Sequence, residues 1–103
     1  MGQSYQDLID WQKAMEFVME IYRNTKNFPR DEIYGLAAQL RRSSVSIPAS
    51  IAEGQARYSP AEFHNLLGWA RGALVEVETE IILAQNLEYL AQEQGETTVS
   101  QSL

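Results

Sequence analysis

The segment SPAEFHNLLGWARGALVEVETEIILAQNL (residues 59–87) decides the fold, because a strong helix start leads into a long apolar stripe. Ser59 can accept hydrogen bonds from first-turn amides, Pro60 suits a position whose amide is unpaired anyway, and Glu62 can bond back to the capping residue. The stripe that follows has helical spacing and consists of Phe63, Leu67, Ala70, Leu74, Val77, Ile81, Ala84 and Leu87 or Glu88. We therefore predict a helix from Ser59 to about Ala91.

Another helix is expected near the N-terminus, from about Tyr5 to Lys26. Phe28-Pro29 ends it, because the residue before a proline avoids helical dihedrals. Its apolar residues recur at steps of three and four and are Leu8, Trp11, Met15, Val18 and Tyr22. We expect this stripe to be the buried face of the helix.

The middle helix is expected from about Asp31 to Ala56, and it contains Pro48. An interior proline removes one backbone hydrogen bond and clashes with the preceding turn, at a cost of ~3 kcal/mol unless the neighbourhood adapts. Serine hydroxyls in the preceding turn can bond nearby backbone groups, so we predict one continuous helix with a kink at Pro48. The expected buried stripe is Ile33, Leu36, Leu40, Ser44, Ile47 and Ile51.

Together these segments predict an all-α fold, an antiparallel up-and-down bundle of three long helices with a short or truncated fourth. The fourth helix would begin in the tail GETTVSQSL (residues 95–103), where Thr97 or Thr98 can serve as a cap. A chain of 103 residues with 45% hydrophobic and 21% charged residues has the size and balance of one globular domain. Residues 1–103 are therefore expected to form a single domain.

The composition favours a soluble, cytoplasmic protein. The absence of cysteine excludes disulfides, thiolate zinc sites and thiol catalysis, and it fits a reducing compartment. The N-terminus lacks the basic start and apolar stretch of a secretory signal, and no run approaches the ~18 apolar residues of a membrane span. A net charge of -6 argues against broad nonspecific binding to nucleic acid. Residues 23–42 nevertheless hold five basic residues against two acidic ones, a local net charge of +3.

No residue cluster fits a catalytic or cofactor-binding template. His64 is the only histidine, which excludes multi-histidine metal sites. A helical di-iron site needs Glu-x-x-His, whereas Glu62 lies two residues before His64. The serines lack a Ser-x-x-Lys or Gly-x-Ser-x-Gly motif, and no phosphate-binding glycine loop is present. We therefore expect no enzymatic activity, no metal, no cofactor and no small-molecule substrate.

Four arginines are the candidate nucleic-acid-binding residues, namely Arg41, Arg42, Arg57 and Arg71. They belong to segments that a bundle would bring together, and the guanidinium fork suits phosphate and carboxylate equally. The alternative is that they pair with carboxylates within or between subunits, at Glu53, Glu76, Glu78 and Glu80.

Two further features indicate packing rather than chemistry. Gly68-x-x-x-Gly72 is expected to let a neighbouring backbone approach the helix. Trp11 and Trp69 lie at or beside stripe positions, which favours a place in the core or in an interface over stacking on nucleic-acid bases.

Three quoted segments carry a resemblance to a known family: DLIDWQKAM (residues 7–15), QLRRSSVSIPASIAEGQAR (39–57) and WARGALVEVETEIILAQNL (69–87). They resemble a bacterial family of four-helix-bundle proteins named for open reading frames in intervening sequences of 23S ribosomal RNA genes. The same superfamily includes the accessory variability proteins of diversity-generating retroelements. The resemblance implies an antiparallel four-helix protomer, a homopentamer, no known catalysis and a suspected RNA-related role, for which the four arginines are the matching positions.

We therefore predict a non-enzymatic, homo-oligomeric helical-bundle protein that serves as a scaffold associated with RNA or a ribonucleoprotein. The alternative is a protein-binding adaptor of the same fold that makes no contact with nucleic acid.

Overall fold

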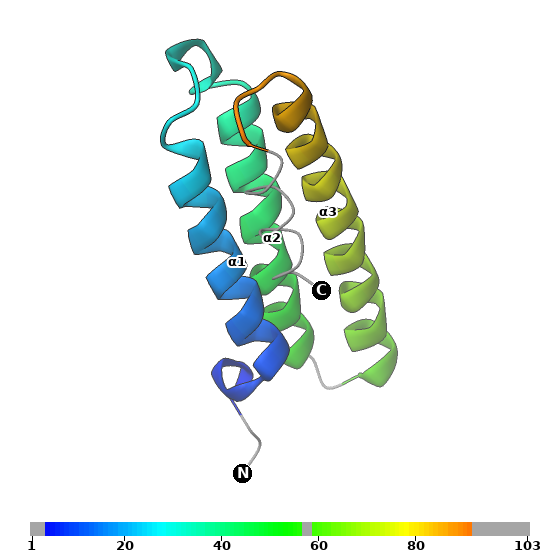
Figure 1. Cartoon of the computed structure of the whole chain (residues 1–103). Helices are drawn as coiled ribbons and strands as arrows, with labels where there is room; N and C mark the ends of the chain where they lie inside the picture. The colour runs from blue at the N-terminus through cyan, green and yellow to red at the C-terminus, as the bar shows by residue number, and fades with distance from the viewer. Residues whose placement is uncertain (1–3, 57–58, 92–103) are drawn as a thin grey trace.

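The computed structural model describes residues 4–56 and 59–91, which form three long helices with α2 in the middle (Figure 1). The helices are α1 (Ile9–Thr25), α2 (Leu36–Ala56) and α3 (Pro60–Asn86), and they run alternately up and down. Two 3-10 turns precede α1 and α2, at Tyr5–Asp7 (η1) and Arg30–Glu32 (η2). The α2 helix packs against both α1 and α3, whereas no Cα atom of α1 lies within 8 Å of one in α3. Within the described residues, α1 and α3 are therefore held together mainly through α2.

The all-α class is confirmed, but the prediction of a fourth helix is wrong. The described residues contain three long helices and no strand. The tail on which the prediction rested, residues 95–103, lies outside the described residues. In the described part of the chain, no helix is both long enough and apolar enough to cross a membrane.

The predicted start of α3 is confirmed, and its predicted end is wrong. The Ser59 hydroxyl accepts a hydrogen bond from the Glu62 amide at 3.4 Å, and Pro60 is the first helical residue. The helix ends at Asn86, five residues before the expected end. Glu88 then has a φ of 64°, a left-handed conformation that stops a helix.

The α1 helix begins later than the sequence indicates. Ser4 caps the 3-10 turn η1, since its hydroxyl accepts from the Gln6 amide at 3.2 Å. Leu8 then has extended backbone angles, and α1 starts at Ile9 with no side-chain cap.

The α2 helix is continuous through Pro48, as predicted. Serine hydroxyls of the preceding turn donate to backbone carbonyls, from Ser44 to Arg41 at 2.9 Å and from Ser46 to Ser43 at 2.7 Å. These bonds satisfy the hydroxyls inside the bundle, which fits the adaptation expected around the proline. The kink itself stays a prediction.

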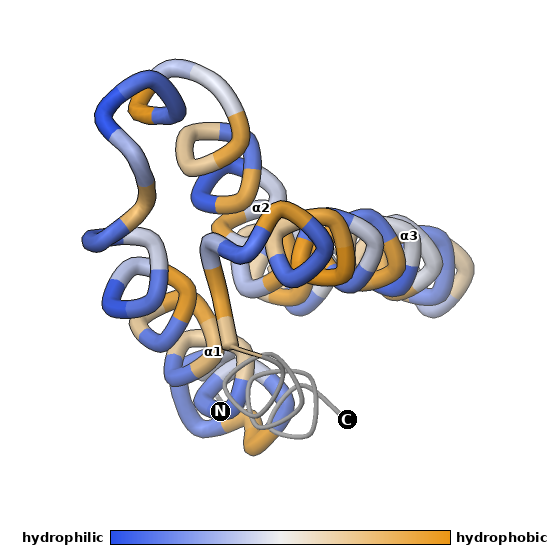
Figure 2. Tube along the Cα trace, turned by 45° about the horizontal axis from the view of Figure 1, so that its top comes forward, coloured by the Kyte–Doolittle hydropathy of each residue, from blue (hydrophilic) through white to orange (hydrophobic). Residues whose placement is uncertain are grey.

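The expected buried face of α1 is wrong at Met15 and Tyr22, whereas Leu8 and Trp11 of the predicted stripe pack against the core. The buried residues of α1 are Ala14, Phe17, Ile21 and Thr25. Met15 and Tyr22 of the predicted stripe are 38% and 44% exposed, because α1 is apolar on two adjacent faces and α2 covers one of them. Figure 2 shows hydrophobic segments on all three helices.

The predicted stripes of α2 and α3 correspond more closely to the core. Every predicted member within α2 is buried, whereas Ile33 lies before the helix and is exposed. The stripe of α3 is buried at Ala70, Val77, Ile81 and Ala84, and partly buried at Phe63, Leu67 and Leu74.

The C-terminal end of α3 is attached to the connection between α1 and α2. The Tyr89 hydroxyl donates to Oε2 of Glu32 at 2.9 Å, while Oε1 of Glu32 accepts from the Leu36 amide at 3.1 Å. The rings of Tyr89 and Phe28 lie 5.4 Å apart, and Leu90 is buried. One carboxylate therefore caps the start of α2 and also holds the segment that follows α3.

Candidate functional site

A pocket of about 390 Å³ lies between α1 and α3. Its apolar lining consists of Ala14, Phe17, Ile47, Ile51, Leu67, Ala70 and Leu74. Asp10 and Lys13 of α1 and Arg71 of α3 add charges to this lining. The volume falls within the range of about 300–1,000 Å³ that is common for binding pockets. The pocket offers apolar contact and carries two positive side chains against one negative one.

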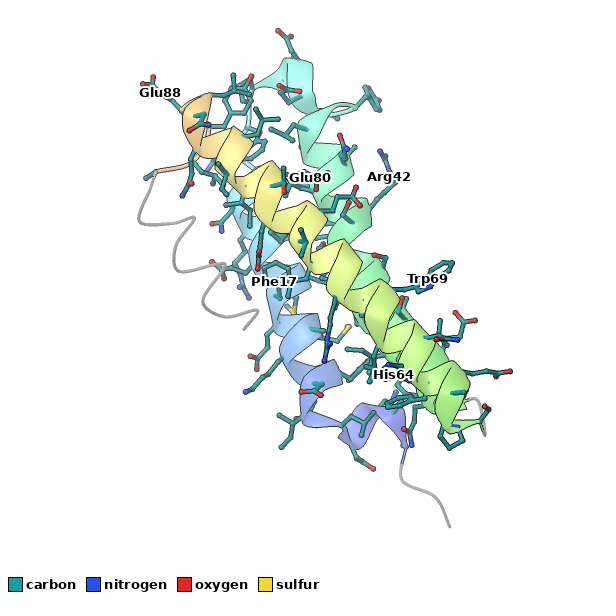
Figure 3. The ribbon with its side chains drawn as sticks, turned by 90° about the vertical axis from the view of Figure 1, so that its right-hand side faces the viewer. Phe17, Arg42, His64, Trp69, Glu80 and Glu88 are labelled. Carbon is teal, nitrogen blue, oxygen red and sulfur yellow. The ribbon has the colours of Figure 1, made fainter. Side chains whose placement is uncertain are left out.

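The structure does not gather the predicted arginines into one patch. Arg71 is exposed and lines the pocket between α1 and α3. Arg42 is also exposed, and it projects outward from α2 (Figure 3). Its charge acts on Glu80, which is not a pocket residue. Arg57 lies outside the described residues.

Arg41 has a structural role that the sequence did not indicate. Its Nε donates to Oγ1 of Thr25 at 2.9 Å, and its guanidinium lies 4.7 Å from the centre of the Tyr22 ring. Both partners belong to α1, so Arg41 connects α2 to α1 through a hydrogen bond and a cation–π contact. The Nε atom and one face of the Arg41 guanidinium are therefore engaged with α1.

A polar cluster between α2 and α3 includes a buried carboxyl group. Oγ of Ser43 donates to Oε1 of Glu76 at 3.0 Å. Glu80 is 5% exposed, and neither of its side-chain oxygens has a hydrogen-bond partner. Burial raises the pKa of Glu80, and the charge of Glu76 raises it further, while the Ser43 hydroxyl and the Arg42 charge oppose the shift. Because burial is the largest of these effects, the net result is a pKa of Glu80 above its ordinary value of 4.5.

The predicted absence of a metal site meets no contrary observation in the described residues. His64 is exposed on α3. Within residues 4–56 and 59–91, no group of three or more His, Cys, Asp or Glu residues is arranged to hold a metal ion. The expectation that the protein binds no metal stays a prediction.

The outward side of α3 is rich in uncovered apolar surface. Trp69 is 75% exposed and projects away from the bundle (Figure 3), so a place in the core of this protomer is excluded. Trp11 instead packs against the core and contacts Tyr5 edge to face at 5.5 Å. A Cβ atom at Gly68 or at Gly72 would meet nothing within 4 Å. The backbone approach expected at these glycines does not occur within the described protomer.

Comparison with known proteins places this fold in a family. No curated protein matches the chain. The chain is similar to a solved crystal structure from Bacteroides thetaiotaomicron, described as a protein with unknown function from the S23 ribosomal protein family. The TM-score is 0.80 and the sequence identity 30%, over 91% of this chain and 88% of that chain. The model of the 23S rRNA-intervening sequence protein family matches residues 6–102, and the chain belongs to this family.

Proposed function

We propose that this protein is a non-enzymatic, homo-oligomeric helical scaffold that associates with RNA or a ribonucleoprotein. The single observation that carries the proposal is the uncovered apolar surface of α3. Large side chains such as Trp69, Val75 and Ile82 are more than half exposed there, beside two glycines that leave open space. Large exposed apolar side chains are typical of an interaction site, and a second copy of the chain is a partner that is always present.

The RNA part of the proposal rests on the family and on two exposed arginines. Arg42 and Arg71 remain available to phosphate, whereas Arg41 is engaged with α1. Two separated cations on one protomer bind phosphate weakly, but an oligomer repeats them, so several weak contacts act together. The homopentamer and the relation to retroelement accessory proteins stay predictions from the resemblance.

The second candidate function is a protein-binding adaptor, and the charge distribution favours it. Outside its buried side, the α3 helix carries one arginine against three glutamates, Glu62, Glu76 and Glu78, and acidic surfaces repel nucleic acid. Under this alternative the apolar side of α3 binds a different protein, and bound partners should survive high salt and nuclease treatment.

Two measurements test the proposal. Sedimentation at micromolar concentration should give a mass several times the 11.7 kDa of one chain. A stable monomer would contradict self-association. A mobility-shift assay with structured RNA should show binding that weakens as salt rises. Arg42→Gln combined with Arg71→Gln should weaken the binding further. Binding that is absent at low salt, or unaffected by this pair, would leave the adaptor as the better explanation.

A further inference from the structure

The outer side of α3 carries a row of five uncharged residues. We define this α3 face by Gly68, Gly72, Val75, Thr79 and Ile82, which recur at steps of four and three and so share one side of the helix. Val75 and Ile82 are 60% and 55% exposed, and no atom fills the space above the two glycines. The Thr79 hydroxyl already donates to the Val75 carbonyl at 2.9 Å. The α3 face can therefore be buried without leaving an unpaired side-chain polar group.

A second apolar face lies on α1, and its shape is the opposite. We define this α1 face by Met15, Met19 and Tyr22, which are exposed and lie at steps of four and three. The guanidinium of Arg41 covers part of the Tyr22 ring. Large side chains thus project from α1, whereas the α3 face is hollowed at its glycines. Methionine is flexible and adapts to irregular surfaces, so it suits such a hollow.

The charges around the two faces are also complementary. Lys26 continues the spacing of the α1 face four residues after Tyr22, and with Arg41 it makes that end positive. Glu76, Glu78 and Arg71 adjoin the α3 face, so the charges beside it are two negative and one positive. Opposite charges at the rim of an interface steer association and disfavour wrong partners.

We propose that the α3 face of one copy packs against the α1 face of a second copy, head to tail. This inference rests on the proposed self-association and specifies its surfaces. The two faces differ in shape and charge, and each complements the other better than it complements itself. Both are present on every copy, so each copy can bind two neighbours. Such a heterologous contact generates a closed ring or an open filament, and the expected homopentamer is one such ring.

The test uses two variants of the full chain, Met19→Arg and Ile82→Arg, each of which spoils one face. Each variant alone should lose the wild-type assembly and sediment as an 11.7 kDa monomer. An equimolar mixture should form a one-to-one dimer of twice that mass, because the intact α3 face of one variant binds the intact α1 face of the other. Glu16→Arg on α1 and Gln39→Arg on α2 are controls at exposed positions outside both faces, and should keep the wild-type mass.

Several results would overturn the inference, and they differ from failure of the proposed function. If Met19→Arg keeps the wild-type mass while Ile82→Arg is monomeric, α3 pairs with α3. If neither variant changes the mass, self-association stands but uses other surfaces. If both variants are monomeric and their mixture stays monomeric, with circular dichroism showing wild-type helix content, the faces do not bind each other. A monomeric wild type removes both proposals.

Discussion

The buried carboxyl group of Glu80 gives a prediction with a definite sign. Both carboxyl oxygens lie between α2 and α3 without a hydrogen-bond partner, and burial raises the pKa of the group above its ordinary value of 4.5. The folded protein therefore holds the Glu80 proton more tightly than the unfolded chain does. Folding stability should fall as pH rises from about 4.5 through the folded-state pKa, and should then level off.

Glu80→Gln keeps the size of the side chain and removes the charge. An unsatisfied buried polar group costs about 1–3 kcal/mol, and more when it is charged. The glutamine amide is also polar and buried, so only the added cost of the charge separates the two proteins. We expect the free energy of unfolding of Glu80→Gln to exceed that of wild type by about 1 kcal/mol at pH 8. The difference should vanish below pH 4, where the wild-type carboxyl group is protonated in both states. For a domain of this size, each kcal/mol corresponds to roughly 4–8 °C in Tm.

The assay is urea denaturation followed by circular dichroism from pH 3.5 to 8.5, at one fixed protein concentration because self-association adds to stability. Glu16→Gln, at an exposed position of α1, is the control and should change stability by less than roughly 0.5 kcal/mol. A Glu80→Gln variant that is less stable than wild type at pH 8 would refute the reasoning, since it would mean that the carboxylate has a stabilising partner. A difference that is constant with pH would refute the raised pKa.

Three further predictions concern packing. Gly72→Ala should stabilise the protomer by about 0.5–1 kcal/mol in thermal unfolding, because the added Cβ meets open space. Gly54→Ala should destabilise it by about 1 kcal/mol, because the added Cβ would lie 2.8 Å from the Phe63 ring. Equal effects of the two substitutions would contradict the geometry. Arg41→Ala should lower the unfolding free energy by about 1–2 kcal/mol, and an unchanged value would show that its contacts with α1 are dispensable. Tyr89→Phe should speed hydrogen exchange in the segment after α3, and unchanged exchange would contradict this. The hydrogen bond to Glu32 is the main cause that raises the pKa of Tyr89. The bond should therefore stabilise the fold below pH 10, and this stabilisation should be lost as pH rises through the folded-state pKa.

The parts of the fold that depend on local chemistry could be predicted from the sequence. Ser59 and Pro60 mark the start of α3 because a cap needs only its own first turn. The end of α3 could not be found in the same way. Apolar residues continue beyond Asn86, and the segment is held by the bond from Tyr89 to Glu32, 57 residues earlier in the chain. A contact at that separation leaves no periodic signal.

The candidate site was only partly predictable, for a geometric reason. Arg41 and Arg42 look equivalent in the sequence, but consecutive helix residues point about 100° apart. Arg41 therefore reaches Thr25 and Tyr22 on α1, whereas Arg42 faces outward. Glu80 was predicted only as a possible partner for an arginine. Its burial depends on how α3 is rotated against α2, which the spacing of its carboxylates does not determine.

The two apolar faces of α1 explain both the wrong prediction and the proposed assembly. Periodicity detects an apolar face without identifying what covers it, and in α1 the steps of three and four fit the Met15 face as well as the Phe17 face. Within the protomer α2 covers the Phe17 side, so Met15 and Tyr22 of the predicted stripe are left for another partner. On α3, Gly72 is a position where the protomer and the proposed assembly favour different residues. Alanine there would favour the isolated protomer, yet it would fill the hollow that the proposed contact needs, so protomer stability and assembly should respond to this substitution in opposite directions.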